Sequence, residues 1–494
     1  MQKVGLIIPG SSFLVDERVT PGLGILRVAA VLEQANISVD VLDLCGVQNY
    51  QEVVREYIVF SGASTIGIGA TSPQMPAVAK IVQAIRKTGK SIKLIFGGPH
   101  ATAVNAAARM EQKKGTMGRG NAGLQQILDM FDVVIAGDGE RSIFIALREN
   151  SPHLIDGDSL DSDLFLQASE IAQYPLPARH LIDIHSYKME LDRTLYTPLI
   201  AQLGCPYGCG FCGLRLSPSF RKIRIRPIDN VLEEIRQIYQ IYGFSGINFL
   251  DDELDVNPRF LGDLQEIIKL QDQLGARFRA RGFLKAELIT QPMADLMYQA
   301  GFRHVLIGFE SGHPRILENI KKRATIDDNT RAVELCQKAG LSVKALMSIG
   351  HAGESAETIQ ATHDWLLKVR PEQFDVTVIT CYPSTPYYDM AVPHPTGKDI
   401  FVYTATNGDK LYSENVDFLE EPQYYKGEAG QYKSFVFTDY LSREELVTMR
   451  DWLEKDVREK LGLSYYTSHA EALFDHSMGQ RLPDKILKRT NKNP

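Results

Sequence analysis

Cys205, Cys209 and Cys212 stand in one short glycine-rich segment, with three residues between the first two and two residues between the last two. Thiolates at this spacing can ligate three irons of a [4Fe–4S] cube from a single loop. A fully ligated cube would need a fourth cysteine, and none lies near this segment in the sequence. The iron left without a protein ligand could bind and reduce a small molecule, so the spacing predicts a catalytic cluster.

Two other roles for these thiols fit the sequence poorly. A structural zinc ion takes four ligands, usually as two pairs, and no second cysteine or histidine pair lies within reach in the sequence. A disulfide framework would need many more cysteines than the six in the chain. The glycines within and around the segment instead give a loop the freedom to wrap a cube.

Phe211 adds an aromatic residue just before the last cysteine. With it, the segment resembles the Cys-x3-Cys-x2-Cys signature of the radical S-adenosylmethionine superfamily. The resemblance implies that S-adenosylmethionine chelates the open iron through its amino and carboxylate groups. It also implies reductive cleavage of that cofactor and abstraction of hydrogen from an unactivated carbon atom.

The elements before this loop, in residues 1–148, alternate short apolar runs with helical patterns. We expect helices such as Gly24–Gln34 and Ala77–Thr88, and strands at Val4–Ile8, Val39–Leu44, Ile66–Gly69, Lys93–Phe96 and Val133–Ile135. This α/β pattern predicts an N-terminal doubly wound parallel sheet. Ligands of such sheets lie beyond the carboxyl ends of the strands.

Small residues and one glutamate fill the loops that follow these strands: Thr71, Ser72, Gly97, Gly98, Gly137, Gly139 and Glu140. Glycines there let the backbone approach a large ligand, although tight turns of a sheet also place glycines at such points. Taken with the cysteine segment, the runs Thr20–Leu26, Gly97–Thr102 and Gly137–Glu140 resemble the Rossmann-like cobalamin-binding domain of one large branch of the superfamily. The resemblance implies that these loops contact cobalamin, although some relatives keep the fold and have lost the cofactor.

One motif of that domain is absent. Its lower cobalt ligand comes from Asp-x-His-x-x-Gly, and the nearest counterpart here, Asp16–Pro21, has Arg18 in place of the histidine. Many members of the branch bind cobalamin without a protein ligand, so we expect cobalamin with no histidine on cobalt. His100 follows the fourth strand and is expected to be structural.

After a polar segment, a second repeating pattern begins. Residues 149–194, which include the run Tyr174–Leu181 with two prolines, are expected to form a linker that straps the two units together. Residues 195–395 are expected to form a partial (β/α)6 barrel, with an active site at the carboxyl ends of its strands. We expect strands at Leu199–Leu203, Ile247–Leu250, Arg277–Ala280, His304–Phe309, Ser342–Ser348 and Phe374–Thr380, and helices such as Asp229–Tyr242 and Pro292–Ala300.

The strand ends of this predicted barrel carry the remaining site candidates. The runs Phe309–Gly312 and Cys381–Pro386 match recurrent motifs of the cobalamin branch. By that resemblance Glu310 or Ser311 contacts S-adenosylmethionine, together with Phe211, Gly350 and Lys285. Relatives often carry arginine where Lys285 stands, near the methionyl carboxylate. A glycine-dependent turn with a solvated carboxylate is the plain alternative for Glu310.

Cys381 and the run Asp251–Glu253, which also lie at predicted strand ends, can each be interpreted as functional or as purely structural. Cys381 could donate a hydrogen atom or a proton near the substrate, or it could be a buried free cysteine. In the run Asp251–Glu253, adjacent strand residues point to opposite faces, so only one of the two aspartates can face the lumen. A polar lumenal contact is favoured there over a metal site.

Composition limits the partners. The net charge of −7 argues against a nucleic-acid surface. The one basic run, Arg221–Arg226, favours a strand edge or a contact with an anionic substrate. No apolar run reaches membrane-spanning length, and the three remaining cysteines form no pairing pattern, so we expect a cytoplasmic protein. Its expected partners are a small-molecule substrate and an electron donor such as flavodoxin or ferredoxin.

Residues 396–494 carry no recognisable motif and are expected to cover the barrel mouth and select the substrate. The whole pattern predicts an enzyme, a cobalamin-dependent radical S-adenosylmethionine methyltransferase that acts on an unactivated carbon of a small metabolite, lipid or natural-product precursor. A radical cyclase or rearrangement enzyme of the same family is the alternative. A methylthiotransferase fits less well because its basic RNA-binding domain is missing, and a cofactor-binding sensor would not need an open iron.

Overall fold

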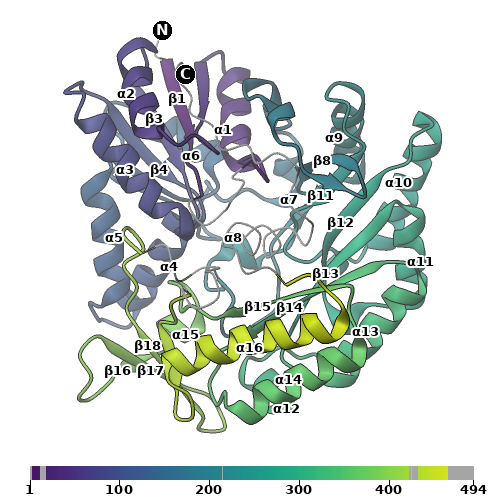
Figure 1. The fold of residues 1–494 in the computed structure, drawn as a ribbon. Coiled ribbons are helices and arrows are strands. Elements are labelled where there is room, and N and C mark those ends of the chain that lie inside the picture. The colour runs from purple at the N-terminus through teal and green to yellow at the C-terminus, as the bar shows by residue number, and fades with distance from the viewer. Residues whose placement is uncertain (1–2, 12–17, 214, 422–423, 425–431, 466–494) are drawn as a thin grey trace.

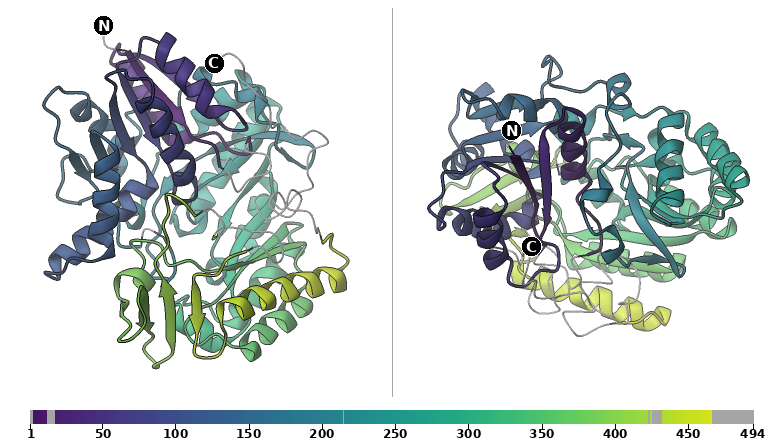
Figure 2. Two further views of the ribbon diagram at one scale, coloured as in Figure 1. Left: turned by 60° about the vertical axis from the view of Figure 1, so that its left-hand side comes forward. Right: turned by 90° about the horizontal axis from the view of Figure 1, so that it is seen from above.

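The computed structural model describes residues 3–11, 18–213, 215–421, 424 and 432–465. Two α/β units lie side by side, and a C-terminal region lies below them in the view of Figure 1. The view from above in Figure 2 shows the N-terminal unit on the left and the second unit on the right.

The N-terminal unit contains a six-stranded parallel sheet in the order β2-β1-β3-β4-β5-β6. Its strands are β1 (Lys3–Ile8), β2 (Ser38–Asp43), β3 (Thr65–Gly69), β4 (Lys93–Gly97), β5 (Val133–Gly137) and β6 (Leu154–Gly157). Helices α1 (Leu23–Gln34) and α6 (Gly139–Ala146) cover one face, and α2 (Tyr50–Phe60), α3 (Met75–Arg86), α4 (Pro99–Lys113) and α5 (Arg119–Met130) cover the other. Because both faces are covered, the inner strands β1, β3, β4 and β5 are mostly apolar and buried, while the edge strand β2 is more polar and partly exposed. The predicted doubly wound sheet is confirmed.

The second unit is a curled sheet with six consecutive parallel strands, which confirms the predicted partial barrel. These strands are β8 (Thr194–Leu199), β11 (Gly246–Phe249), β12 (Arg279–Leu284), β13 (Phe302–Glu310), β14 (Ser342–Ile349) and β15 (Gln373–Val378), and the short β7 (Glu190–Leu191) pairs antiparallel with β8. The outer face is covered by α9 (Ile228–Gln240), α10 (Phe260–Leu274), α11 (Gln291–Gln299), α13 (Ile326–Lys338) and α14 (Ala356–Val369), as Figure 1 shows. The short α12 (Pro314–Asn319) follows β13.

Two predicted barrel strands were misplaced. The strand expected at Leu199–Leu203 ends at Leu199, because the Asp251 carboxylate accepts hydrogen bonds from the backbone of residues 201 and 202 and draws the chain out of the sheet. The short β9 (Gln202–Leu203) then pairs antiparallel with β10 (Arg224–Ile225). The strand expected at Arg277–Ala280 instead runs from Arg279 to Leu284, and it tolerates Gly282 because the Leu254 side chain packs where a Cβ would lie.

The segment between the two sheets contacts both of them. It contributes β6 to the first sheet and contains α7 (Ala168–Ile171). The backbone N–H of Ala178 donates to the carbonyl of Leu26 in α1, at 3.0 Å. The neighbouring Arg179 places its guanidinium 2.5 Å from the Glu234 carboxylate of α9. Residues 178 and 179 therefore tie the first unit to the second.

The C-terminal region packs on the carboxyl ends of both sheets. It contains an antiparallel sheet of β16 (Val392–Pro393), β17 (Ile400–Thr404), β18 (Lys410–Glu414) and β19 (Val436–Thr438), preceded by α15 (Pro386–Asp389) and followed by α16 (Arg443–Leu461). Tyr432 donates to the carbonyl of Val378 at the end of β15, at 2.9 Å. The Phe418 ring lies 5.8 Å from the ring of His100, at the end of β4. No helix among the described residues is long and apolar enough to span a bilayer.

Candidate active site

The cysteine loop is closed at its base by backbone contacts. It leaves the barrel after β9 and returns through α8 (Pro218–Arg221) to β10. The N–H of Cys205 donates to the carbonyl of Phe220 at 2.9 Å. Gly204 has φ +91° and lies against the carbonyl of Lys222, so neither its backbone conformation nor its surroundings admit a side chain. The loop therefore begins and ends at one fixed point.

The middle of the loop is attached to the barrel. The N–H of Gly210 donates to the carbonyl of Ile320 at 2.9 Å, and its own carbonyl accepts from the N–H of Tyr387 at 3.1 Å. A Cβ at Gly210 would lie 2.7 Å from the Tyr387 ring. The ring of Phe211 meets that of His351 edge to face, with centroids 5.1 Å apart. These contacts hold the segment between Cys209 and Cys212 against the ends of β13, β14 and β15.

The donor set fits an iron–sulfur cluster. Burial raises the pKa of all three thiols, that of Cys205 to about 11. At Cys209 the ammonium groups of Lys322 and Lys285 oppose this shift and favour the thiolate. Among the described residues no three His, Cys, Asp or Glu side chains converge as ligands of one metal ion. Three thiolates on one loop can each ligate one iron of a cluster, which takes one thiolate per iron.

A buried chain of polar side chains runs beside this loop. Lys322 Nζ lies 3.1 Å from Glu310 Oε1, and Ser348 Oγ donates to Glu310 Oε2 at 2.8 Å. Ser348 Oγ also lies 2.8 Å from His351 Nε2, and His351 Nδ1 lies 3.3 Å from the Tyr387 hydroxyl. Burial lowers the pKa of His351 to about 3, so the ring is neutral and relays hydrogen bonds without charge. The chain links the end of β13 to the cysteine loop.

Glu310 is held in a strained conformation at the centre of this chain. Its φ is +66°, in the left-handed region that a non-glycine residue rarely adopts, and the register of β13 on β14 shifts between Gly308 and Glu310. Gly308 leaves room for the ion pair, because a Cβ there would lie 2.9 Å from Lys322 Nζ. Burial lowers the pKa of Lys322, but the negative groups around it, Glu310 first and then Cys209 and Glu253, together outweigh burial and hold that pKa well above its usual value.

Lys285 joins the same group of charges. Its Nζ donates to the carbonyl of Lys322 at 3.0 Å, lies 2.9 Å from Glu287 Oε1 and sits 4.1 Å above the centre of the Tyr207 ring. Tyr207 belongs to the cysteine loop, so Lys285 lies beside the expected cluster. Nearby, burial raises the pKa of Glu253 to about 7, and its Oε2 is buried without a hydrogen-bond partner among the described residues.

Ser311 and Gly350 lie on the two sides of this group. The hydroxyl of Ser311 lies 3.3 Å from that of Thr362 in α14 and accepts from the N–H of His313, so it is turned toward the helix and away from Lys322. Gly350 has φ +89°, and a Cβ there would lie 3.1 Å from Val436 of β19. Its N–H donates to Glu354, whose pKa burial raises to about 7.

Of the two neighbouring aspartates, only Asp251 is buried; it caps the backbone at residues 201 and 202, while Asp252 is exposed and accepts from the N–H of Gly204. This matches the expected division between the two faces. Cys381 is buried where the barrel, α5 and β18 meet, and burial raises the pKa of its thiol to about 11. The Arg119 guanidinium partly offsets that shift.

The small-residue loops of the first sheet gather at the carboxyl ends of its strands. Gly98 has φ +94°, and a Cβ there would lie 3.0 Å from the backbone nitrogen of Ala70. Gly137 has φ +86°, and a Cβ there would lie 2.5 Å from the backbone of Gly157. Close packing between neighbouring loops therefore already accounts for these two glycines. Gly97 differs, because a Cβ there would lie 3.7 Å from the carbonyl oxygen of Ile135, which is an ordinary van der Waals distance.

The polar members of these loops are tied to the sheet and to each other. Ser72 Oγ lies 2.8 Å from Nδ1 of the buried His100, and Thr71 caps the short helix that starts at Ser72. Glu140 is buried in an ion pair with Arg27 of α1 at 2.7 Å, and a Cβ at Gly139 would lie 3.0 Å from Val28. The loops follow β3, β4 and β5, and the first of them borders the point between β1 and β3 where the strand order reverses, which is where sheets of this kind bind large ligands. That placement fits cobalamin.

Arg18, which stands where the cobalamin motif has its histidine, bonds to residues outside these loops. Its guanidinium lies 3.1 Å from the Asp43 carboxylate and 5.4 Å above the Tyr187 ring, and it is buried. The preceding residues of the motif counterpart, Asp16 and Glu17, lie outside the described residues. Arg18 thus joins the end of β2 to the segment between the two units.

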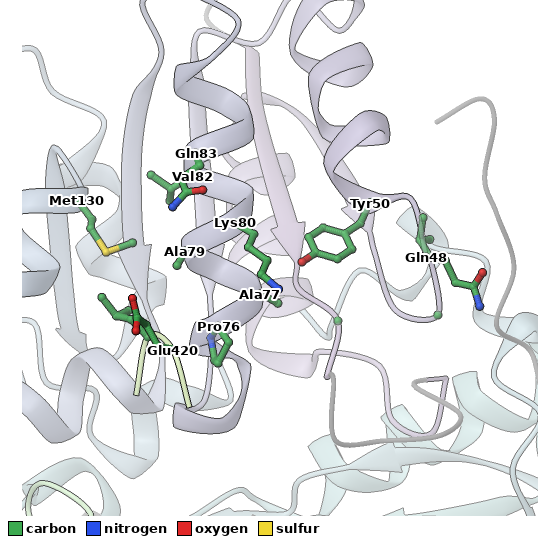
Figure 3. A pocket seen from close by; sticks show the side chains of 14 residues that line it. Gln48, Tyr50, Pro76, Ala77, Ala79, Lys80, Val82, Gln83, Met130 and Glu420 are labelled. Carbon is green, nitrogen blue, oxygen red and sulfur yellow. The ribbon is translucent and has the colours of Figure 1, made fainter. Parts of the chain in front are cut away.

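A surface cavity of about 750 Å³ runs across α3, as Figure 3 shows. Its lining includes Gly10 and Pro76, which follow β1 and β3 in the sequence, and Leu419 and Glu420 of the C-terminal region. In Figure 3, Glu420 lies beside Pro76 and Met130. The cavity therefore opens from the point where the strand order reverses, although none of the predicted site residues is among its lining residues.

The structure also assembles residues to which the sequence analysis gave no role: Arg119, Lys322, Ser348, His351 and Tyr387. His351 lies three residues after the predicted strand Ser342–Ser348, and that strand-end position was the available signal. Arg119 begins α5, Lys322 lies in the loop after α12, Ser348 lies within β14 and Tyr387 lies in α15. No local sequence pattern therefore marks these four residues.

The comparisons with known proteins match both units. The family description "Radical SAM superfamily" matches residues 199–366, and "B12 binding domain" matches residues 15–128. An uncharacterized methyltransferase from Pyrococcus horikoshii is 24% identical over 411 residues, which cover 79% of this chain and 83% of that protein. The anaerobic magnesium-protoporphyrin IX monomethyl ester cyclase of Rubrivivax gelatinosus is 21% identical and aligns with 67% of this chain and 59% of its own length.

Among solved structures, the radical S-adenosylmethionine methyltransferase TsrM from Kitasatospora setae, with cobalamin and a [4Fe–4S] cluster bound, has a similar fold. The TM-score is 0.65 at 17% identity, over 94% of this chain and 91% of that one. The shared fold includes both units and their order along the chain.

Proposed function

Since this chain belongs to the radical S-adenosylmethionine enzymes that carry a cobalamin-binding domain, we propose that it methylates an unactivated carbon atom of a small molecule. One observation carries the proposal: the cysteine loop of the barrel is bonded to the carboxyl edge of the N-terminal sheet, where the small-residue loops gather. A methyl donor on one sheet and a radical initiator on the other would then face the same space.

When bound, the cluster would supply one electron that cleaves a carbon–sulfur bond of S-adenosylmethionine, the cleaved cofactor would take a hydrogen atom from the substrate carbon, and cobalamin would supply a transferable methyl group. The chain would hold the cluster through Cys205, Cys209 and Cys212. It would hold cobalamin through the loops that contain Thr71, Ser72, Gly97, Gly98, Gly137, Gly139 and Glu140.

Side chains at the barrel ends would orient S-adenosylmethionine. Glu310 presents a carboxylate fixed by Lys322 and Ser348, which suits an amino group or ribose hydroxyls of the cofactor. Lys285 offers an ammonium group beside Tyr207, which suits the methionyl carboxylate. Phe211 and Gly350 would line the same place. Ser311 would support Glu310 through the backbone, since its hydroxyl is bonded toward α14.

The C-terminal region would complete the site. Its contacts with Val378 and His100 place it across the ends of both sheets, where it would exclude water and select the substrate. Cys381 lies under this region and could give a hydrogen atom or a proton to the product. We place the reaction in the reducing cytoplasm, with flavodoxin or ferredoxin as electron donor and with no nucleic acid as partner.

Ring formation is the second candidate, because a cyclase is among the similar proteins. The two reactions differ in the fate of the methyl group. The reconstituted enzyme would be incubated anaerobically with S-adenosylmethionine deuterated in its methyl group and with a small-molecule extract. Deuterium in a product supports methylation, whereas a product without deuterium, formed while methionine keeps the label, supports ring formation. The Cys209→Ala variant is the control, and consumption of S-adenosylmethionine by neither protein would refute both candidates.

A further inference from the structure

Two carboxylates of the N-terminal unit, one fully buried and one 11% exposed, hold the segment that directly follows the cysteine loop. The first is Asp158, just after β6, whose side chain is fully buried. Its Oδ1 accepts from the Ser217 hydroxyl at 2.5 Å and from the N–H of Ser219 at 3.0 Å. Its Oδ2 lies 2.6 Å from Arg109 of α4, which fixes the carboxylate from the other side. Asp158 therefore attaches the start of α8 to the first sheet.

The second carboxylate is Asp138, at the end of β5. Its Oδ2 lies 2.5 Å from Arg224 Nη1 and also accepts from the N–H of Leu166. The Arg224 side chain is 2% exposed and donates to the carbonyls of Leu166 and Ser219, at 3.0 and 2.9 Å. Its guanidinium stacks 4.7 Å from the centre of the Phe165 ring. This arginine belongs to the basic run of the sequence, which thus serves the contact between the units.

Each end of this connection touches a proposed cofactor site. Arg224 is the strand partner of Leu203, which stands two residues before Cys205. Asp138 stands between Gly137 and Gly139, in the loop proposed to contact cobalamin. The Asp138–Arg224 ion pair therefore connects the β5 loop directly to the base of the cysteine loop.

We propose that the Asp138–Arg224 pair, with the Asp158 contacts beside it, couples the two cofactor sites, so that filling one site strengthens binding at the other. The inference rests on the proposed function for the identity of the two ligands. Its physical basis is that a buried ion pair tolerates little displacement, since a separated partner leaves an uncompensated charge in the interior. By linkage, the coupling must be equal in both directions.

The test measures cobalamin binding rather than methyl transfer. Hydroxocobalamin is titrated into cluster-loaded protein and into protein freed of the cluster by chelation, and the two dissociation constants are compared. In the natural protein we expect the dissociation constant without the cluster to be about ten times that with the cluster, which is a ratio of about ten. In the Asp138→Asn/Arg224→Met double variant, which removes both charges together, the ratio should fall to about one. Lys222→Met is the matched control, because the ammonium group of this exposed neighbour bonds to Gln167 and lies 5.8 Å from the centre of the Phe165 ring, and among the described residues it forms no ion pair with Asp138 or Asp158. This variant should leave the ratio unchanged.

A second variant covers the case in which the double variant does not fold. Ser217→Ala removes only the short hydrogen bond to Asp158 and should reduce the ratio partially. A ratio near one in the natural protein, or an unchanged ratio in both variants, would overturn the coupling while leaving the proposed reaction intact. Absence of cobalamin uptake by any protein would instead overturn the proposed function. Hydrogen exchange across residues 203–224 in cofactor-free protein gives an independent readout, with faster exchange expected in the double variant than in Lys222→Met.

Discussion

At the residue scale, Glu310 combines backbone strain with a buried ion pair. A non-glycine residue at φ +66° costs about 1–3 kcal/mol, and the contacts with Lys322 and Ser348 offset that cost. The strain turns the carboxylate toward the cysteine loop instead of along the strand. Strain of this kind is typical of positions that bind a ligand, and this agrees with the proposed role of Glu310 toward S-adenosylmethionine.

The three loop cysteines should be individually essential. Replacement of Cys205, Cys209 or Cys212 by alanine removes one ligand from a cluster that already has an open iron, so cleavage of S-adenosylmethionine should fall to background. The measurements are iron content after anaerobic reconstitution, expected at about four per chain, and formation of 5′-deoxyadenosine. Cys336→Ala is the matched control, because that thiol is buried among helices of the barrel. Cleavage retained by any loop variant would contradict the assignment.

His100 should make the N-terminal unit sensitive to acid. Burial lowers the pKa of His100 to about 3, below the usual value of 6.5, so the unfolded chain binds a proton that the folded chain does not. Stability from this residue is present above pH 6.5 and is lost as the pH falls. Between pH 7.5 and 5.5, the stability of the natural protein relative to His100→Asn should drop by about 1.4 kcal/mol in urea unfolding. A difference independent of pH would show that the ring titrates normally.

At the element scale, two adjacent glycines at the end of β4, Gly97 and Gly98, have different reasons to lack a side chain. Gly98 is required by the backbone, since it has φ +94° and faces the backbone of Ala70. Gly97 has neither constraint, so its lack of a side chain is explained better by space kept for a ligand than by packing. The two neighbouring positions therefore allow the ligand site to be tested apart from the fold.

We expect Gly97→Val to prevent cobalamin uptake while leaving the thermal unfolding and the absorption of the cluster unchanged. A valine at the end of a strand is well tolerated, and it would occupy the space proposed for the corrin. Gly98→Val is the contrasting variant and should lower the stability of the unit, because a Cβ would press on the loop after β3. Undiminished cobalamin binding by a folded Gly97→Val protein would place the corrin elsewhere.

At the scale of the whole molecule, side chains cross from the N-terminal unit to the second unit and to the C-terminal region that packs on it. Arg119, at the start of α5, inserts between the rings of Tyr388 and Phe401, with its guanidinium carbon 3.6 and 3.9 Å from their centres. It also donates to the carbonyl of Tyr388 at 2.6 Å. Together with Arg179 and Arg224, it fixes the distance between the two carboxyl edges.

Replacement of Arg119 by methionine should weaken this contact by about 2 kcal/mol, since cation–π contacts shielded from water are worth about that much. We expect calorimetry to show two separate unfolding transitions in place of one, because each unit has its own core. Arg86→Met is the control, because its ion pair with Asp132 is exposed and should contribute under about 1 kcal/mol. A single unchanged transition in Arg119→Met would show that other contacts dominate the interface.

The amino-acid sequence by itself determined the features that depend on neighbouring residues. The spacing of Cys205, Cys209 and Cys212 needs only one loop, and the apolar runs of the two sheets follow from burial on both faces. The strand predicted at Leu199–Leu203 failed for the complementary reason. Its apolar pattern continues past Leu199, but the chain is turned aside by Asp251, which lies about fifty residues further on.

Only the tertiary structure decided which polar groups surround the cysteine loop and how the two units meet. Lys322, His351 and Tyr387 converge on Glu310 and the loop from separate elements, and no periodicity encodes such a meeting. The basic run Arg221–Arg226 predicted a strand edge or an anionic ligand. Arg224 does lie in the short strand β10, but Arg224 and Arg226 are buried against the protein's own Asp138 and Glu234. The sequence shows which kinds of group a charged side chain can bind, but only the fold determines its actual partner. A buried charge needs an opposite charge beside it, and that charge comes from a distant part of the chain.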